Sequence, residues 1–167
     1  MEIGSKNGWP ADRVTNFADN RFAIDGVDCG GMEGFLQATK FADPDIQVEV
    51  CALAGARAKK RGSSRTRAWQ AVQTLWWRGV ALDRHGEGYQ RLLDRAFRAM
   101  FEQSAAFRVA LAATGTAALA HSMGRTDPRE TILTIDEFCS RLTALRDGLH
   151  ADPSLIENPF PPCHPCH

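Results

Sequence analysis

The amino-acid sequence predicts an α+β fold: a predominantly helical single domain with a small N-terminal β-hairpin. Its 167 residues are enough for one domain that buries a core. Residues 21–29 (RFAIDGVDC) alternate around Asp25-Gly26, a common two-residue hairpin signal. After residue 42, apolar positions recur at helical spacing between capping signals, which predicts several amphipathic helices.

The first helices are predicted from their caps and their apolar spacing. A short helix over residues 32–41 follows Gly30-Gly31. Asp43-Pro44 is a typical N-cap with proline at the first helical position, so a second helix is expected from there to about Lys59-Lys60. Residues 68–79 (AWQAVQTLWWRG) are expected to form a shorter helix, or a helix and a turn.

The second half of the chain predicts three further helices. One begins near Tyr89, and its core stripe consists of Leu92, Leu93, Ala96, Phe97, Met100 and Phe101. The next begins near Ser104 and ends at Gly115, a natural C-cap. The capping box of Thr134 and Glu137 opens the last helix, whose inward residues are Phe138, Leu142, Leu145 and Leu149.

We expect the domain to occupy residues 1–150 and residues 151–167 to form a mobile tail. Five of the eight prolines lie in those last residues, and that composition forms no core. The tail ends in CHPCH, residues 163–167, which matches the C-x-x-C-H haem-attachment pattern and also contains two Cys and two His. An unstructured tail is the default interpretation, so no metal or cofactor is expected.

Composition excludes several classes of function. The chain has 20 basic and 20 acidic residues, so its net charge indicates no general affinity for polyanions. The five cysteines are an odd number, and three of them are scattered through apolar surroundings, unlike a disulfide framework. The sequence shows neither the pattern of a secretory signal peptide, a charged segment followed by an apolar one, nor the apolar run of about 18 residues that predicts a transmembrane helix. We therefore expect a reduced, cytoplasmic protein without membrane association.

The helix over residues 32–41 (MEGFLQATKF) carries the most informative polar pattern. Glu33, Gln37 and Lys40 fall within an arc of roughly 60° on a helix. One interpretation is an ordinary surface helix with a solvated face. The other is a functional site, because the helix starts just after Gly30-Gly31, where backbone N–H groups can bind an anion.

This segment resembles the NADAR superfamily. Its members carry an S-N-F-like start, an aromatic residue, a D-G hairpin and then an E-h-x-F-Q-A-x-K-F helix. The matching residues here are Asn16-Phe17, Phe22, Asp25-Gly26, Glu33, Phe35, Gln37-Ala38 and Lys40-Phe41. The resemblance covers about residues 10–149 and is most specific from Glu33 to Phe41.

The resemblance implies a cofactor-independent N-glycosidase that hydrolyses a ribose N-glycosidic bond. The favoured substrate is ADP-ribose attached to a nucleobase, notably guanine in DNA, so ADP-ribosylated DNA is a candidate partner. An alternative is hydrolysis of the phosphoribosylamino-pyrimidine intermediates of riboflavin biosynthesis. A third possibility is a non-catalytic module that binds ADP-ribose or another nucleotide.

The candidate catalytic residues are Glu33, Gln37 and Lys40. Breaking the bond passes through an oxocarbenium-like state, which needs a carboxylate near the anomeric carbon. Glu33 can stabilise that charge and activate water, the ammonium of Lys40 would keep Glu33 ionised, and Gln37 would orient it.

The candidate substrate-binding residues come from several segments. They are Asn16, Phe17, Gly30, Gly31, Arg61, Arg65, Arg67, Trp76, Trp77, His121, Arg125 and Asp127. The arginines suit a phosphate, although a mobile basic loop is the alternative for Arg61, Arg65 and Arg67. The Trp76-Trp77 pair is either a stacking surface for a base or one core residue beside one at the edge of the core.

One segment departs from the family pattern. Many members carry a Trp-Gly and a Gly-Lys-Asn just before the last helix. Here residues 121–134 (HSMGRTDPRETILT) contain no tryptophan, and His121, Asp127 and Thr131 occupy the segment instead. Losing an aromatic partner for a pyrimidine favours ADP-ribose, whose second phosphate can be held by charge.

Overall fold

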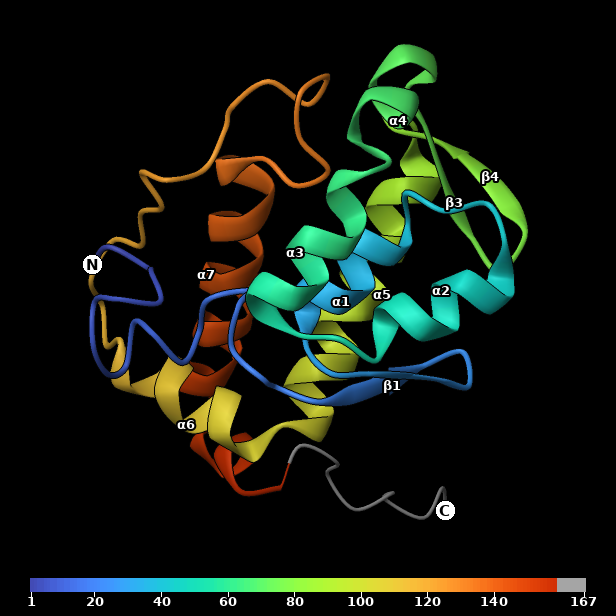
Figure 1. Cartoon of the computed structure of the whole chain (residues 1–167). Coiled ribbons are helices and arrows are strands. Elements are labelled where there is room, and N and C mark those ends of the chain that lie inside the picture. The colour runs from blue at the N-terminus through green and yellow to red at the C-terminus, as the bar shows by residue number, and fades with distance from the viewer. Residues whose placement is uncertain (159–167) are drawn as a thin grey trace.

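A computed structural model describes residues 1–158 and confirms the α+β fold (Figure 1). Within those residues it contains seven α-helices, two antiparallel strand pairs and one 3-10 helix. The helices are α1 Met32–Ala38, α2 Pro44–Cys51, α3 Gly55–Ser63, α4 Thr66–Val72, α5 Glu87–Gln103, α6 Ala105–Ala113 and α7 Ile135–Ala151. Strand β1 (Phe22–Ile24) pairs with β2 (Val27–Cys29), and β3 (Thr74–Trp77) pairs with β4 (Val80–Asp83).

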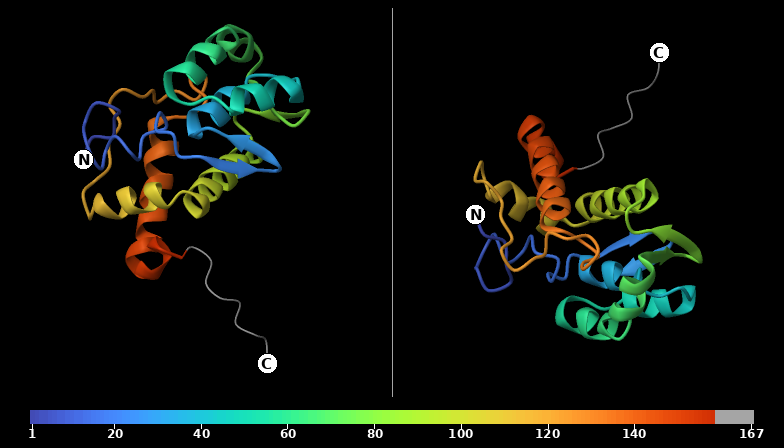
Figure 2. Two further views of the ribbon diagram at one scale, coloured as in Figure 1. Left: turned by 60° about the horizontal axis from the view of Figure 1, so that its bottom comes forward. Right: turned by 90° about the horizontal axis from the view of Figure 1, so that it is seen from above.

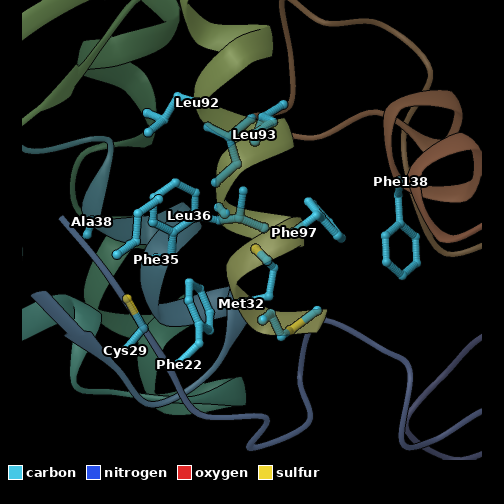
Figure 3. Packing of buried hydrophobic residues seen from close by; sticks show 14 of the residues in the cluster. Phe22, Cys29, Met32, Phe35, Leu36, Ala38, Leu92, Leu93, Phe97 and Phe138 are labelled. Carbon is cyan, nitrogen blue, oxygen red and sulfur yellow. The ribbon is translucent and has the colours of Figure 1, made fainter. Parts of the chain in front are cut away.

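Helix α1 lies at the centre of the molecule, and all seven of its residues are buried. It contacts α2, α3, α5 and β2. Phe35 packs edge-on against Trp77, with ring centroids 5.1 Å apart, and lies 6.3 Å from the ring of Phe22. Figure 3 shows Phe35 and Leu36 close to α5 in the same apolar cluster. A short helix in such a position keeps both its apolar and its polar side chains out of bulk water.

Two glycines let neighbouring segments approach α1 closely. A Cβ at Gly34 would lie 2.2 Å from the carbonyl oxygen of Leu53, so no larger residue fits where the α2–α3 connection crosses α1. A Cβ at Gly62 would lie 1.9 Å from Oε1 of Gln37. Helix α3 therefore rests directly on the polar side chains of α1.

The helix expected from Asp43 to Lys60 is in fact two helices. Helix α2 ends at Cys51, and α3 starts at Gly55. Gly55 has φ +52°, which L side chains rarely adopt, and a Cβ there would lie 3.0 Å from the carbonyl oxygen of Phe17. The expected N-cap at Asp43 is confirmed, because its side chain accepts a hydrogen bond from the Asp45 N–H.

Residues 68–79 were expected to be mainly helical, which is wrong beyond Val72. Gln73 adopts a left-handed conformation and ends α4, and β3 and β4 then form a second hairpin. Its turn is Arg78-Gly79, both with positive φ. Trp76 and Trp77 therefore lie on opposite faces of a strand rather than on a helix. The first hairpin at Asp25-Gly26 and the Thr134–Glu137 capping box are as predicted.

The packed domain extends beyond residue 150, where the tail was expected to begin. Helix α7 runs to Ala151, and the 3-10 helix Pro153–Ile156 follows it. Leu155 and Ile156 pack against the core, and Nε of Arg108 donates a hydrogen bond to the Ile156 carbonyl oxygen at 2.9 Å. The CHPCH motif, residues 163–167, lies outside the described residues. No helix among residues 1–158 is long and apolar enough to span a bilayer.

A buried ion pair joins the end of the second hairpin to the first turn of α7. Arg84 is only 1% exposed, and its guanidinium donates two hydrogen bonds to the carboxylate of Glu137 at 3.0 and 2.8 Å. Its Nε donates to the Thr131 carbonyl oxygen at 2.9 Å. The Tyr89 hydroxyl donates to the Ile132 carbonyl oxygen at 2.6 Å. Residues 131–132 are therefore held against both α5 and α7.

Breaking this pair should destabilise the protein strongly. Arg84→Met leaves the half-buried Glu137 carboxylate without its cation, which costs about 3–5 kcal/mol of unfolding free energy for a buried pair. The matched control is Arg91→Met, because Arg91 pairs with Glu87 on an exposed face and such pairs contribute about 0.5 kcal/mol or less. Urea denaturation of both variants measures the difference, and equal losses would contradict the assigned role of Arg84.

Candidate active site

One pocket of about 380 Å³ brings together distant parts of the chain. Its lining comes from residues 4–5 and 15–17, from α1 with Lys40, from α3 and α4, and from the segment 121–134 with Phe138. The volume falls within the usual range of small-molecule sites. The segment 121–134, orange in Figure 1, forms one wall opposite α3 and α4.

Side-chain amides join the two walls at one end. Gln70 of α4 donates through Nε2 to the Glu130 carbonyl oxygen at 3.0 Å. Gln73, at the end of α4, donates to the Arg129 carbonyl oxygen at the same distance. The loop wall is therefore tied to α4 as well as to the Arg84–Glu137 pair.

The polar face of α1 lies on this pocket and not in bulk water. Glu33 is 7% exposed, Gln37 5% and Lys40 6%, and all three line the pocket. Nε2 of Gln37 donates a hydrogen bond to Oε1 of Glu33 at 2.8 Å. The interpretation of this face as an ordinary solvated helix surface is therefore wrong.

Burial controls the protonation of Glu33. Desolvation raises the pKa of its carboxyl above the ordinary 4.5, although the hydrogen bond from Gln37 and the charges of Lys59 and Lys40 act in the opposite direction. The backbone N–H of Glu33 donates to the Asn16 carbonyl oxygen at 3.1 Å, which ties the N-terminal segment to the start of α1. The carboxyl of Glu33 therefore stays protonated to higher pH than an exposed one.

Lys40 lies just past the end of α1 and does not pair directly with Glu33. Its Nζ donates to Thr66 Oγ1 at 3.1 Å and to the Gly62 carbonyl oxygen at 3.5 Å. Burial lowers its pKa to about 8, an effect that Glu33 opposes and Lys59 reinforces. The charge of Lys40 does lower the pKa of Glu33, as expected, but desolvation of the carboxyl raises it by more. The expectation that Lys40 keeps Glu33 ionised is therefore wrong.

His121 supplies a second proton-transfer group on the opposite wall. Its Nδ1 lies 2.9 Å from the Ile3 carbonyl oxygen. A carbonyl can only accept, so Nδ1 carries a proton and Nε2 is the nitrogen left to exchange one. The ring packs edge-on against Phe138, with centroids 5.3 Å apart. His121 lines the same pocket as Glu33, as the sequence suggested.

The aromatic surface of the pocket comes from an unexpected residue. Trp69 of α4, which is not among the predicted site residues, lines the pocket and is only 1% exposed. Thr66 lies one turn earlier on the same helix and also lines the pocket. Core residues share this i, i+3 spacing, so no local sequence signal distinguished Trp69 as a pocket residue. Phe17, a predicted site residue, lines the pocket too.

The predicted tryptophan pair lies away from the pocket. Trp77 is buried in the core, where its Nε1 donates to Asp25 Oδ2 at 2.8 Å. Trp76 is partly buried, and its backbone N–H donates to the Thr39 carbonyl oxygen at 2.8 Å. Neither residue lines the pocket, so the stacking role proposed for them is wrong.

The glycine pair and Asp127 are also outside the pocket lining. The Gly30 N–H donates to the Cys51 carbonyl oxygen, and a Cβ at Gly31 would lie 2.6 Å from the carbonyl oxygen of Ala18. Both glycines permit close packing, and neither is positioned on the pocket. Asp127 pairs with Arg129 at 2.8 Å on the outer side of the loop wall, and that pairing lowers its pKa to about 2.

The predicted arginines divide into two groups. Arg125 lines the pocket and lies 3.4 Å from Glu130. Arg61 stacks over the ring of Phe41 at 4.8 Å, and Arg61, Arg65 and Arg67 are exposed and outside the lining. The cation that α3 places on the pocket is Lys59, which also lies 5.6 Å over the ring of Phe17.

Polar atoms without hydrogen-bond partners concentrate at this site. Among the described residues, Asn16 Oδ1, Gln37 Oε1 and Trp69 Nε1 are buried without such a partner, and all three residues line the pocket. Buried polar groups are nearly always paired in folded proteins. No cluster of three potential metal ligands occurs among residues 1–158. The groups that line the pocket and can take part in chemistry include carboxyls, an amide, amines and an imidazole.

Comparison with known proteins agrees with this architecture. The family described as bacteriophage protein GP30.3 matches residues 8–147. A 17.1 kDa protein in the Gp30-rIII intergenic region of Enterobacteria phage T4 is 37% identical over 150 residues, which cover 89% of this chain and 98% of that protein. The NMR structure of the E. coli protein YbiA matches with a TM-score of 0.59 at 20% identity, over 92% of this chain and 86% of that one.

Glu33→Gln should remove a pH-dependent cost to folding. Burial raises the pKa of the folded carboxyl above 4.5, so the unfolded chain loses this proton at lower pH than the folded chain does. The contribution of Glu33 to wild-type stability should therefore fall as pH rises above about 4.5, whereas Gln does not titrate. Urea denaturation from about pH 4 to 8 tests this.

The matched control for this stability test is Glu49→Gln on an exposed position of α2. The stability of Glu33→Gln relative to wild type should increase with pH, and that of the control should not. A pH-independent difference for Glu33→Gln would contradict the raised pKa.

Proposed function

Because the chain belongs to the family of bacteriophage protein GP30.3, a NADAR-family domain, we propose that it is an N-glycosidase acting on a ribosylated nucleobase. The reaction proposed is hydrolysis of the ribose N-glycosidic bond without a cofactor. The coarse assignment rests on the family, and the particular chemistry rests on the pocket.

The observation that carries the proposal is the buried carboxyl of Glu33 on the pocket. A carboxyl on a pocket is a typical general base and stabiliser of positive charge, and desolvation raises the pKa of Glu33 above its ordinary value. Gln37 holds one carboxylate oxygen at 2.8 Å and so limits the orientations of the group. Acids with a perturbed pKa in a pocket cluster at functional sites.

The proposed step uses one water molecule and two protein groups. The water oxygen bonds to C1′ of the ribose, the C1′–N bond breaks, and its electron pair goes to the base nitrogen. Glu33 accepts the proton of the water and stabilises the positive charge that develops on the sugar. Nε2 of His121 donates a proton to the leaving base. Gln37 orients Glu33, and Lys40 and Lys59 hold negative groups of the substrate.

The charges around the pocket favour a substrate with more than one phosphate. Lys40 and Lys59 line it, as does Arg125 beside Glu130 at 3.4 Å, and charge-assisted contacts to phosphate oxygens are strong. ADP-ribose on a nucleobase, notably guanine in DNA, offers a pyrophosphate to these cations. Segment 121–134 lacks a tryptophan, but Trp69 offers an aromatic surface for either substrate class. The absence of that tryptophan therefore does not favour one substrate class over the other.

Two alternatives remain distinguishable. The riboflavin-pathway phosphoribosylamino-pyrimidines carry a single phosphate and would also fit beside Trp69. A non-catalytic module that binds ADP-ribose would need the cations and Trp69 but not Glu33. Incubation with both substrate classes, followed by mass spectrometry of released ribose phosphate or ADP-ribose, separates the three possibilities.

Glu33→Gln should reduce turnover by a factor on the order of 10² to 10⁴, because a general acid–base group contributes about that much. The variant keeps the shape of the side chain, so substrate binding should persist in a calorimetric titration. Glu49→Gln is the control and should retain full turnover. A folded Glu33→Gln protein that works within about threefold of wild type would remove Glu33 from the chemistry.

The protein should hydrolyse ADP-ribosylated guanine with a higher kcat/KM than the riboflavin intermediate. The pyrophosphate gives Lys40, Lys59 and Arg125 a second group to bind, worth about tenfold for one charge-assisted hydrogen bond. Both substrates are compared in one enzyme preparation. A ratio about tenfold or more in favour of the riboflavin intermediate would reverse the substrate assignment and leave the N-glycosidase proposal intact.

A further inference from the structure

The charges of this neutral chain are strongly segregated along the sequence. Residues 50–82 contain seven Lys and Arg and no Asp or Glu, so the rest of the chain has 13 cations against all 20 acids. Six of the seven fall within residues 57–67, namely Arg57, Lys59, Lys60, Arg61, Arg65 and Arg67. A local basic stretch of this kind is the electrostatic footprint of polyanion binding.

These six cations form one exposed surface on α3, α4 and their connection, which we call the basic face. All six are exposed, and within residues 1–158 none of them forms a salt bridge. In both views of Figure 2 the segment that carries them lies at the outside of the molecule. Nothing in the described part of the chain neutralises this surface.

The exposed arginines on the opposite wall of the pocket are paired with acids, unlike the cations of the basic face. Arg125 lies 3.4 Å from Glu130, and Arg129 lies 2.8 Å from Asp127, so each exposed arginine of segment 121–134 has its own acid. A polyanion approaching the pocket therefore meets free positive charge on one side only.

The basic face is continuous with the pocket. Lys59 belongs to both, and Thr66 and Trp69 line the pocket from α4, which carries the exposed Arg67 and follows the exposed Arg65. A pocket of about 380 Å³ accommodates a group of nucleotide size but not a polymer. The backbone of a polymeric substrate must therefore lie outside, along the rim.

We propose that the basic face binds the phosphodiester backbone of single-stranded DNA and presents a modified base to the pocket. This proposal rests on the proposed function for the identity of the base, and on charge complementarity for the strand. A base cannot be reached while it is stacked in a duplex, so a single strand is the form that fits. Each lysine or arginine that neutralises a phosphate releases a counterion, which makes the binding sensitive to salt.

The test uses Lys60→Glu/Arg65→Glu/Arg67→Glu, three exposed residues outside the pocket lining. Fluorescence anisotropy measures binding of an unmodified, labelled DNA strand of about 20 nucleotides at several salt concentrations. The triple variant should bind about tenfold or more weakly at low salt. The slope of log affinity against log salt should become shallower by about 2, since each lost contact removes about 0.7.

The matched control is Arg21→Glu/Arg91→Glu/Arg98→Glu, which makes the same change in net charge at exposed positions outside the basic face. At about 0.15 M salt the control should keep its affinity within about twofold, because the Debye length there is only about 8 Å and charges outside the basic face are screened from the strand. Equal loss in both triple variants would overturn the proposal and indicate a net-charge effect. So would a wild-type protein that fails to bind the strand at low salt, or one that binds an RNA of the same sequence more tightly.

The outcome is independent of the catalytic proposal. Glu33→Gln should bind the strand as wild type does, because Glu33 lies inside the pocket and the probe carries no modification. Loss of turnover without loss of strand binding would support both proposals. Strand binding by a protein that hydrolyses neither substrate class would support the basic face and reject the N-glycosidase assignment.

Discussion

The buried pair of Arg84 and Glu137 is the constraint on which the shape of the site depends. Hydrogen bonds from Arg84, from the Thr134 N–H and from Gln90 lower the pKa of Glu137, although burial, the largest single influence, acts against them. Through these bonds one carboxylate connects the β3–β4 hairpin, α5 and the start of α7. The segment that precedes α7 is thereby fixed as a wall, and it carries His121 to the pocket that contains Glu33.

The fold buries ionisable side chains at its centre, on and just after α1, and these side chains line the pocket. A helix of seven buried residues would normally be apolar all round, but α1 contains Glu33 and Gln37, with Lys40 just beyond it. Burial shifts the carboxyl and the amine toward their neutral forms, so the pKa of Glu33 rises and that of Lys40 falls. Groups tuned in this way cost stability and are typical of sites kept for chemistry.

Three features could not be predicted from the sequence because tertiary contacts, and not local patterns, determine them. The β3–β4 hairpin turns at Arg78-Gly79, where Arg78 has φ +49°, and this dipeptide is not one of the usual hairpin signals. Trp69 was overlooked because an isolated tryptophan on a short helix has no local mark that separates a pocket from a core. Gly30 and Gly31 drew attention as an anion site, whereas backbone oxygens 2.6 Å from their would-be Cβ atoms explain them by packing.

The sequence by itself determined the elements whose signals are complete within a few residues. The Asp25-Gly26 turn, the Asp43 N-cap and the Thr134–Glu137 capping box lie where local hydrogen bonding placed them, and helical spacing put Glu33, Gln37 and Lys40 on one face. Only the tertiary structure decided that this face meets a pocket rather than water. Periodicity tells which side chains share a face, but their exposure depends on what packs above them, and here that is α3, α4 and a loop some 90 residues away in the chain.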